Sequence, residues 1–158
     1  MPYFCAVNIR LRKGTKEDMP AVHALIRELA EFEKAPEEVM TSPASMVEDG
    51  FGDRPAFETL VAELDGAIVG ATVFFTKYST WKGRGIYLDD IVVTAAHRRK
   101  GIGTLLFEEL IRVAKDQHAK QLHWQVLDWN TPAIAFYKKY KTSFDAEWIN
   151  CKLDPREY

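Results

Sequence analysis

Cationic residues and glycines occur together in the segment His97–Thr104, which reads His-Arg-Arg-Lys-Gly-Ile-Gly-Thr. It follows an apolar stretch, Ile86–Val93, and precedes an amphipathic one, Ile102–Ala114, so we expect it to connect a strand to a helix. Glycines at such a turn let backbone N–H groups approach an anion, and a helix N-terminus adds partial positive charge. The segment therefore predicts a site for a phosphorylated ligand. The less favoured alternative is a solvated basic turn with a glycine cap.

Two adjacent carboxylates, Asp89 and Asp90, lie inside the apolar stretch Ile86–Val93. Neighbouring residues of a strand point to opposite faces, so we expect at least one carboxylate to point inward. Burial of an unpaired carboxylate costs free energy, so that group needs a partner or a chemical role. Backbone capping by one carboxylate and solvent exposure of the other is an equally good interpretation.

Two further residues near the C-terminal end could contact a ligand. Asn130 can donate and accept hydrogen bonds to a ligand that contains amides. The hydroxyl of Tyr137, with an ordinary pKa of about 10, can protonate a thiolate leaving group. Taken alone, each has a plainer explanation, which is helix capping for Asn130 and core packing for Tyr137.

Acidic residues are concentrated between Glu28 and Glu58, where nine occur and only Lys34 and Arg54 oppose them. Such a concentration attracts a cationic ligand. The alternative is a pair of solvated helix faces.

The predicted elements form an α/β domain with a mixed sheet and helices packed on it, and we expect one domain over residues 1–158. A first strand is expected at Val7–Arg12, followed by a helix that starts at Thr15 or Asp18 and reaches Phe32 and Glu33. The sequence Asp65-Gly66 predicts a two-residue hairpin turn. Further helices are expected at Pro43–Asp49, ending at Gly50, at Ile102–Ala114, and from Thr131-Pro132 to Tyr140; further strands are expected at Phe57–Leu64, Ile68–Tyr78, Ile86–Val93 and Leu122–Leu127, with one or two more in Phe144–Leu153.

Composition argues against several classes of protein. The chain has 158 residues and a net charge of −2, without the basic excess typical of nucleic-acid binding. No segment is long enough and apolar enough to span a membrane, and the N-terminus does not resemble a secretion signal, so we expect a cytoplasmic location. Cys5 and Cys151 have no paired spacing and are interpreted as buried small hydrophobes. The four histidines have no ligand spacing, so no metal is expected.

These segments together resemble the GCN5-related N-acetyltransferases (GNAT), along nearly the whole chain, and within them the diamine acetyltransferase group that includes the spermidine/spermine and thialysine enzymes. The most specific segment for the superfamily is Arg98-x-x-Gly101-x-Gly103. The segment Glu-Asp-Gly-Phe-Gly at 48–52 narrows the resemblance to the group. The runs Tyr-Ser-Thr-Trp-Lys-Gly-Arg at 78–84 and Leu-Asp-Trp-Asn at 127–130 favour the thialysine branch. Two further segments, Ile26–Lys34 and Tyr87–Ile91, also carry the resemblance.

The resemblance implies a mixed, mostly antiparallel sheet of six to seven strands with about four helices, and acetyl transfer from acetyl-CoA to a primary amine in a ternary complex. Tyr137 matches the catalytic tyrosine, and Asp89 is expected to hold the ammonium and accept its proton, through water, with Glu33 nearby. The resemblance also implies a homodimer, in which Glu147–Leu153 is the candidate segment for pairing between the two copies. The matching cofactor positions are Ile91, Val92, Val93, Arg98, Arg99, Lys100, Gly101, Ile102, Gly103, Thr104, Asn130, Thr131, Pro132 and Ala133, and the amine-binding positions are Phe32, Glu33 and Asp89.

Two residues depart from the family pattern. Asp89 stands where the group usually has Glu, and Lys141 stands where the superfamily usually has Gly. If Lys141 is left-handed, Lys141→Gly should raise the unfolding midpoint. The expected substrate is a small cationic amine, either lysine-like or a diamine or polyamine. Acetylation of a protein or peptide, or CoA binding without catalysis, are the alternatives.

Overall fold

The computed structural model describes residues 8–158. The chain divides into two compact units, Met1–Trp124 and Gln125–Tyr158, which are described one after the other. Cys5 and the expected strand start at Val7 lie outside the described residues. The first unit contains β1 (Ile9–Lys13), α1 (Met19–Phe32), α2 (Pro43–Phe51), β2 (Glu58–Leu64), β3 (Ala67–Ser79), β4 (Gly83–Val93), α3 (Ile102–Asp116) and β5 (Leu122–His123), and the second contains α4 (Thr131–Tyr137).

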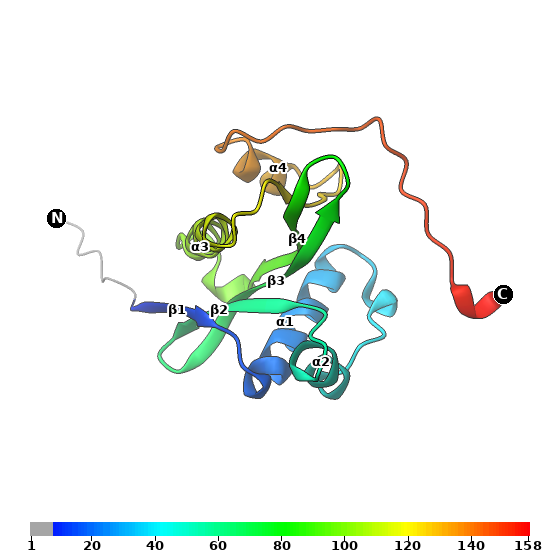
Figure 1. Ribbon diagram of the computed structural model, residues 1–158. Coiled ribbons are helices and arrows are strands. Elements are labelled where there is room, and N and C mark those ends of the chain that lie inside the picture. The colour runs from blue at the N-terminus through cyan, green and yellow to red at the C-terminus, as the bar shows by residue number, and fades with distance from the viewer. Residues whose placement is uncertain (1–7) are drawn as a thin grey trace. The chain divides into compact units, whose positions relative to one another are not determined.

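The five strands form one sheet in the order β1-β2-β3-β4-β5 (Figure 1). The first four are antiparallel neighbours, and β5 runs parallel to β4. The predicted hairpin turn is confirmed, since Asp65 and Gly66 have φ values of 50° and 82° between β2 and β3. Positive φ at both positions is the geometry that a two-residue turn needs to match the strand twist.

Helices cover both faces of the sheet. On one face, buried side chains of α1 and α2 pack with Val61, Ala71, Val73 and Val92. Gly70 faces the other side, where an added Cβ would meet the side chains of Leu106 and Ile102 of α3. Because Gly70 and Ala71 are neighbours in β3, they lie on opposite faces, and Figure 1 shows the sheet between α3 and the pair α1 and α2.

An ion pair fixes the start of α1 to the sheet. Asp18 accepts hydrogen bonds from Arg12 at 2.6 and 2.9 Å and from the backbone N–H of Thr15 at 2.8 Å. These contacts, above all the bond from Arg12, lower the pKa of Asp18 to about 2. Both expected helix starts are thus in use, because Thr15 caps a short 3-10 turn and α1 follows Asp18 with proline in its first turn.

Both long helices end in the same hydrogen-bonding pattern with a left-handed residue. After α1, Lys34 has a φ of 62° and Ala35 donates to the carbonyl of Ala30 at 2.9 Å. After α3, His118 has a φ of 55° and Ala119 donates to the carbonyl of Ala114 at 2.9 Å. This is the Schellman motif, in which glycine is the usual left-handed residue. The first of these ends fixes Glu33, which directly precedes Lys34.

Several boundaries differ from expectation. The sheet has five strands rather than six or seven, because β5 pairs with β4 only through Leu122 and His123 and no strand forms in 144–153. A strand exists only through hydrogen bonds to a neighbouring strand. Residues 144–153 have no such neighbour within the described second unit. Helix α2 continues through Gly50 to Phe51. Gly50 is needed for packing instead, since a Cβ there would lie 2.6 Å from the Phe57 ring.

Three other expectations for the C-terminal part were wrong. Cys151 is exposed rather than buried. Helix α4 ends at Tyr137 rather than near Tyr140. Lys141 is not among the residues with positive φ, so glycine there would relieve no strain. In addition, no helix within residues 8–158 has the length and apolar character needed to cross a membrane.

Candidate active site

A β-bulge in β4 determines how its two carboxylates lie. In the pairing with β3, Asp90 is opposite Val73 and Leu88 is opposite Phe74. Asp89 is therefore the extra residue, without a partner in β3. A bulge interrupts the alternation of side chains and redirects them. The expectation that at least one carboxylate points inward is met by Asp90, which is half-buried, whereas Asp89 is exposed.

Three carboxyl groups from β4 and the end of α1 form one acidic cluster, which consists of Glu33, Asp89 and Asp90. Burial, followed by the negative charges of Asp89 and Glu33, raises the pKa of Asp90 to about 7. Burial also raises the pKa values of Asp89 and Glu33. Carboxylates that lie close enough to repel one another attract a cation, because a cation lowers the electrostatic cost of all three.

Glu28 ties α1 to the loop that follows β4. Its carboxylate accepts hydrogen bonds from the backbone N–H of Ala95 at 2.7 Å and from the hydroxyl of Thr94 at 2.9 Å. One guanidinium nitrogen of Arg98 lies 3.5 Å from the same carboxylate. Glu28 is one of the nine acidic residues between 28 and 58. Its carboxylate binds the loop after β4 and is not part of the acidic cluster.

Arg98 is held within the first unit. Its Nε donates to the carbonyl of Val93 at 2.9 Å, and its guanidinium lies 5.6 Å from the centre of the Phe32 ring. The structure thus brings Phe32 and Arg98 together, two residues expected to serve different ligands. Arg98 also fixes the loop, while Arg99 and Lys100 remain exposed.

One edge of β4 is left open beyond Tyr87. On that side β5 pairs only with Ile86 and Tyr87, so the edge from Asp89 to Val93 has no neighbouring strand among residues 8–158. Such an edge offers backbone N–H and C=O groups to an extended ligand. Ile91, Val92 and Val93, which the family resemblance assigns to the cofactor, lie along this edge.

The open edge leads to the N-terminus of α3. Gly101 is its N-cap residue with a φ of 79°, and no side chain of the described residues caps the helix. The first four N–H groups of a helix lack intrahelical partners, and here they belong to Gly101, Ile102, Gly103 and Thr104. An added Cβ at Gly101 would meet no described atom within 4 Å, and one at Gly103 would meet only Val93 at 3.9 Å. The space beside these N–H groups suits a phosphate.

The second unit contains the remaining predicted residues. Asn130, not Thr131, is the N-cap of α4, and its side-chain oxygen accepts a hydrogen bond from the N–H of Ala133 at 3.3 Å. The capping interpretation of Asn130 is therefore confirmed. Pro132 lies in the first turn of the helix. Tyr137 is buried near its end, with its ring 5.3 Å from that of Phe136.

Asp90 is the residue that sequence reasoning passed over in favour of Asp89. The only available signal was the adjacent pair itself, because the bulge depends on pairing with β3. Among residues 8–158, no group of three or more His, Cys, Asp or Glu side chains is arranged to hold a metal ion.

Comparisons with known proteins identify the family to which the chain belongs. The family model described as acetyltransferase (GNAT) family matches residues 22–141. The chain is 40% identical to a thialysine N-epsilon-acetyltransferase from Bos taurus over 82% of this chain and 81% of that protein, and 39% identical to the one from Mus musculus over 82% and 81%.

Among solved structures, an aminoglycoside N-acetyltransferase in complex with CoA has the same fold. The TM-score is 0.72 at 13% identity, with 92% of this chain and 94% of that chain covered. From the family match and its curated relatives, the chain belongs to the acetyltransferase (GNAT) family.

Proposed function

We propose that the protein transfers acetyl from acetyl-CoA to the primary amine of a small cationic substrate, directly and within a ternary complex. The observation that carries the proposal is the arrangement of β4. One strand holds the acidic cluster at its bulge, and its open edge leads to the uncapped N-terminus of α3. An anionic cofactor and a cationic amine can thus meet on the same strand.

Acetyl-CoA fits the groups that β4 and α3 present. The pantetheine arm would hydrogen-bond to the backbone of Ile91–Val93, as an added strand would. The pyrophosphate would accept hydrogen bonds from the N–H groups of residues 101–104, with Arg99 and Lys100 adding charge. Asn130–Ala133 would line the cofactor channel, as the family resemblance implies. The cofactor supplies the activated acetyl group as a thioester.

The acidic cluster would bind the substrate ammonium and remove one proton. Glu33 and Asp89 hold the ammonium, and Asp90 accepts its proton. A lysine-like amine has a pKa of about 10.4, so transfer to an ordinary Asp is uphill by roughly 9 kcal/mol, at 1.36 kcal/mol per pKa unit. Before the amine binds, the pKa of Asp90 is about 7, and transfer of a proton to it from the amine in solution costs roughly 5 kcal/mol. Asp90 is therefore a better base than Asp89, to which the sequence assigned both roles.

The remaining proton transfer completes the reaction. The neutral amine nitrogen attacks the thioester carbonyl, the new C–N bond forms, and the C–S bond breaks. Tyr137 protonates the departing thiolate, as its match to the family's catalytic tyrosine implies, and the proton that the acylated nitrogen loses restores the neutral hydroxyl of Tyr137.

Replacement of the two aspartates tests the division of roles. Asp90→Asn should lower kcat for amine acetylation about 100-fold or more, in the range expected for a lost general base. Wild-type kcat/KM should rise with pH through about 7, the pKa of Asp90, and this rise should vanish in the variant. Asp89→Asn should mainly raise the KM for the amine.

Asp65→Asn, in the exposed hairpin turn, is the matched control and should retain full activity. Release of CoA with a panel of amines is the measurement. If the wild-type protein acetylates none of the amines in the panel, the proposed reaction is refuted. Normal turnover by Asp90→Asn would remove only its role as base.

We also propose that residues 1–158 act as one domain, that the protein is cytoplasmic, and that it forms a homodimer. The homodimer proposal rests on large apolar side chains in the C-terminal segment. Trp148, Ile149 and Leu153 are 76%, 87% and 70% exposed, and large apolar side chains that are exposed within one short segment favour a contact surface.

A further inference from the structure

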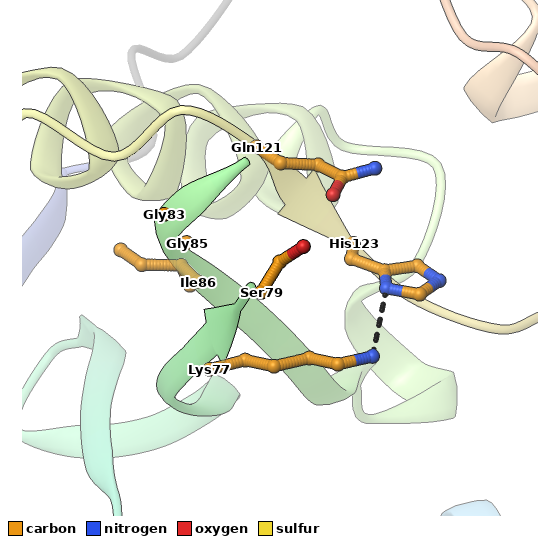
Figure 2. A pocket seen from close by; sticks show the side chains of 7 residues that line it. All are labelled: Lys77, Ser79, Gly83, Gly85, Ile86, Gln121 and His123. Carbon is orange, nitrogen blue, oxygen red and sulfur yellow. Dashed lines mark hydrogen bonds between the residues drawn. The ribbon is translucent and has the colours of Figure 1, made fainter. Parts of the chain in front are cut away.

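A second polar site lies at the end of β4 that is farther from the loop at 94–101, which is proposed to bind the cofactor. A cavity of about 170 Å³ opens where β3, β4 and β5 meet. Figure 2 shows the Lys77 and His123 side chains converging on one side of it, with the Ser79 hydroxyl facing the same space. The lining residues are Lys77, Ser79, Gly83, Gly85, Ile86, Gln121 and His123.

The cationic group of this cavity is Lys77, which is held in place without being neutralised. Its Nζ lies 3.1 Å from Nδ1 of His123, so the ammonium donates and the ring nitrogen accepts. Burial and the Lys77 charge lower the pKa of His123, which keeps that ring neutral and able to accept. Within residues 8–158, no carboxylate forms a salt bridge with Lys77. The ammonium can therefore still pair with an anion.

Ser79 adds a second donor to the cavity. Its Oγ accepts hydrogen bonds from the backbone N–H groups of Trp81 at 3.2 Å and Lys82 at 3.1 Å. These bonds fix the oxygen and leave the O–H hydrogen as the part of the group that can donate. An ammonium and a hydroxyl donor together suit a carboxylate, which accepts several hydrogen bonds.

Tyr87 connects this cavity to the acidic cluster. Its ring lies 5.3 Å from the ammonium of Lys77 and 5.4 Å from the His123 ring. At its other side, the charges of Asp89 and Asp90 contribute to a raised pKa of Tyr87, after burial. Lys77 lies four positions from Val73 in β3, and Val73 is the partner of Asp90, so the backbones of the two charged sites are roughly 13 Å apart along the strand.

One face of the sheet therefore carries a negative site, an aromatic wall and a positive site in succession. Tyr87 pairs with Phe75, and Asp90 pairs with Val73, so the two β3 partners are two positions apart and share a face. A diamine carries positive charge at both ends and would be repelled by Lys77. An amino acid with an amine on a lysine-length side chain matches both ends.

We propose that Lys77, held by His123 and assisted by Ser79, binds the α-carboxylate of a diamino-acid substrate whose side-chain amine is acetylated at the acidic cluster. This assignment rests on the proposed acetyl transfer and narrows its substrate class to amino acids of lysine length. Lys77 is then a residue that determines specificity and takes no part in the acetyl transfer itself.

The test compares each amino acid with its decarboxylated counterpart. The pairs are lysine with 1,5-diaminopentane, and thialysine with its decarboxylated diamine, each as kcat/KM from CoA release. Wild type should prefer the amino acid in both pairs. Lys77→Met should lower kcat/KM for the amino acids about tenfold, as expected for one lost charge-assisted hydrogen bond. The diamines should be unaffected or improved.

Two further variants separate a direct role from a structural one. His123→Gln keeps an acceptor for the Lys77 ammonium and should preserve the preference, whereas His123→Leu should weaken it. Lys115→Met, at an exposed position of α3, is the matched control and should leave both values unchanged.

The possible outcomes distinguish this proposal from the one it rests on. If wild type acetylates neither member of a pair, the proposed reaction fails. If wild type acetylates both equally, or if Lys77→Met lowers both in parallel, the reaction stands and the carboxylate site is refuted.

Discussion

At the scale of single residues, the bulge in β4 separates two neighbouring aspartates into different environments. Asp90 pairs with Val73 and is half-buried, while Asp89 is the extra residue and is exposed. The sequence predicts that this pair matters, because two carboxylates interrupt an apolar strand. It cannot predict which of them becomes half-buried, since the bulge depends on the strand opposite.

The raised pKa of Asp90 makes folding stability depend on pH. The folded protein binds this proton more tightly than the unfolded chain, because the pKa rises from 3.8 to about 7. The contribution of Asp90 to stability is therefore fully present below about pH 4 and is lost as the pH rises to about 7. At pH 8, Asp90→Asn should unfold at a higher urea concentration than wild type. The gain in the free energy of unfolding should be on the order of 1 kcal/mol after allowance for solvent screening.

Urea titrations at pH 5 and pH 8 measure this effect. The difference between the two pH values should shrink in Asp90→Asn and persist in the control Asp65→Asn. A residual slope is expected from Glu33 and Asp89, whose pKa values are also raised. A variant less stable than wild type at pH 8 would contradict the buried charge at Asp90.

At the scale of elements, local patterns predicted the helices and the first four strands better than the strands of the C-terminal part. The apolar stripes of α1 and α3 depend on residues three and four apart, and the predicted segments match within a few positions. The last strands depend on distant partners. Apolar residues at 122–127 and 144–153 predicted pairing, but only Leu122 and His123 find a neighbour in the sheet.

The helix ends offer a test of backbone strain. His118 is exposed, follows α3 and has a φ of 55°, which costs a residue with a Cβ about 1 kcal/mol or more relative to glycine. His118→Gly should therefore raise the free energy of unfolding by about 1 kcal/mol, which shifts the thermal midpoint by about 2–4 °C for a chain of this size. Thermal unfolding followed by calorimetry measures the shift.

Two substitutions serve as controls for that experiment. His118→Ala retains a Cβ and should gain little. Lys141→Gly should lower the midpoint slightly, because Lys141 is not left-handed and glycine adds freedom to the unfolded chain. Equal gains from His118→Gly and His118→Ala would show that the strain lies elsewhere.

At the scale of the whole molecule, the exposed apolar residues of the C-terminal segment predict self-association. Ile149 and Trp148 are largely exposed. Replacement of both by Glu should convert a dimer to a monomer, because two buried charges oppose association. Light scattering coupled to size-exclusion chromatography gives the mass directly.

Arg112→Glu, on the exposed surface of α3, is the control and should leave the mass unchanged. A wild-type protein that runs as a monomer at all concentrations tested would refute the homodimer. If replacement of an exposed residue outside the C-terminal segment disrupts the dimer as strongly, the interface lies elsewhere.

The contact made by Glu28 has a thermodynamic consequence for the order of substrate binding. Glu28 grips the loop at Thr94 and Ala95, and Glu33 follows five residues later at the end of the same helix. In the proposed function, a displacement of the loop at 94–104 on cofactor binding would therefore move Glu33 of the acidic cluster through α1. If cofactor binding changes the affinity for the amine by some factor, amine binding must change the affinity for the cofactor by the same factor, so α1 would couple the two binding steps before any chemistry begins.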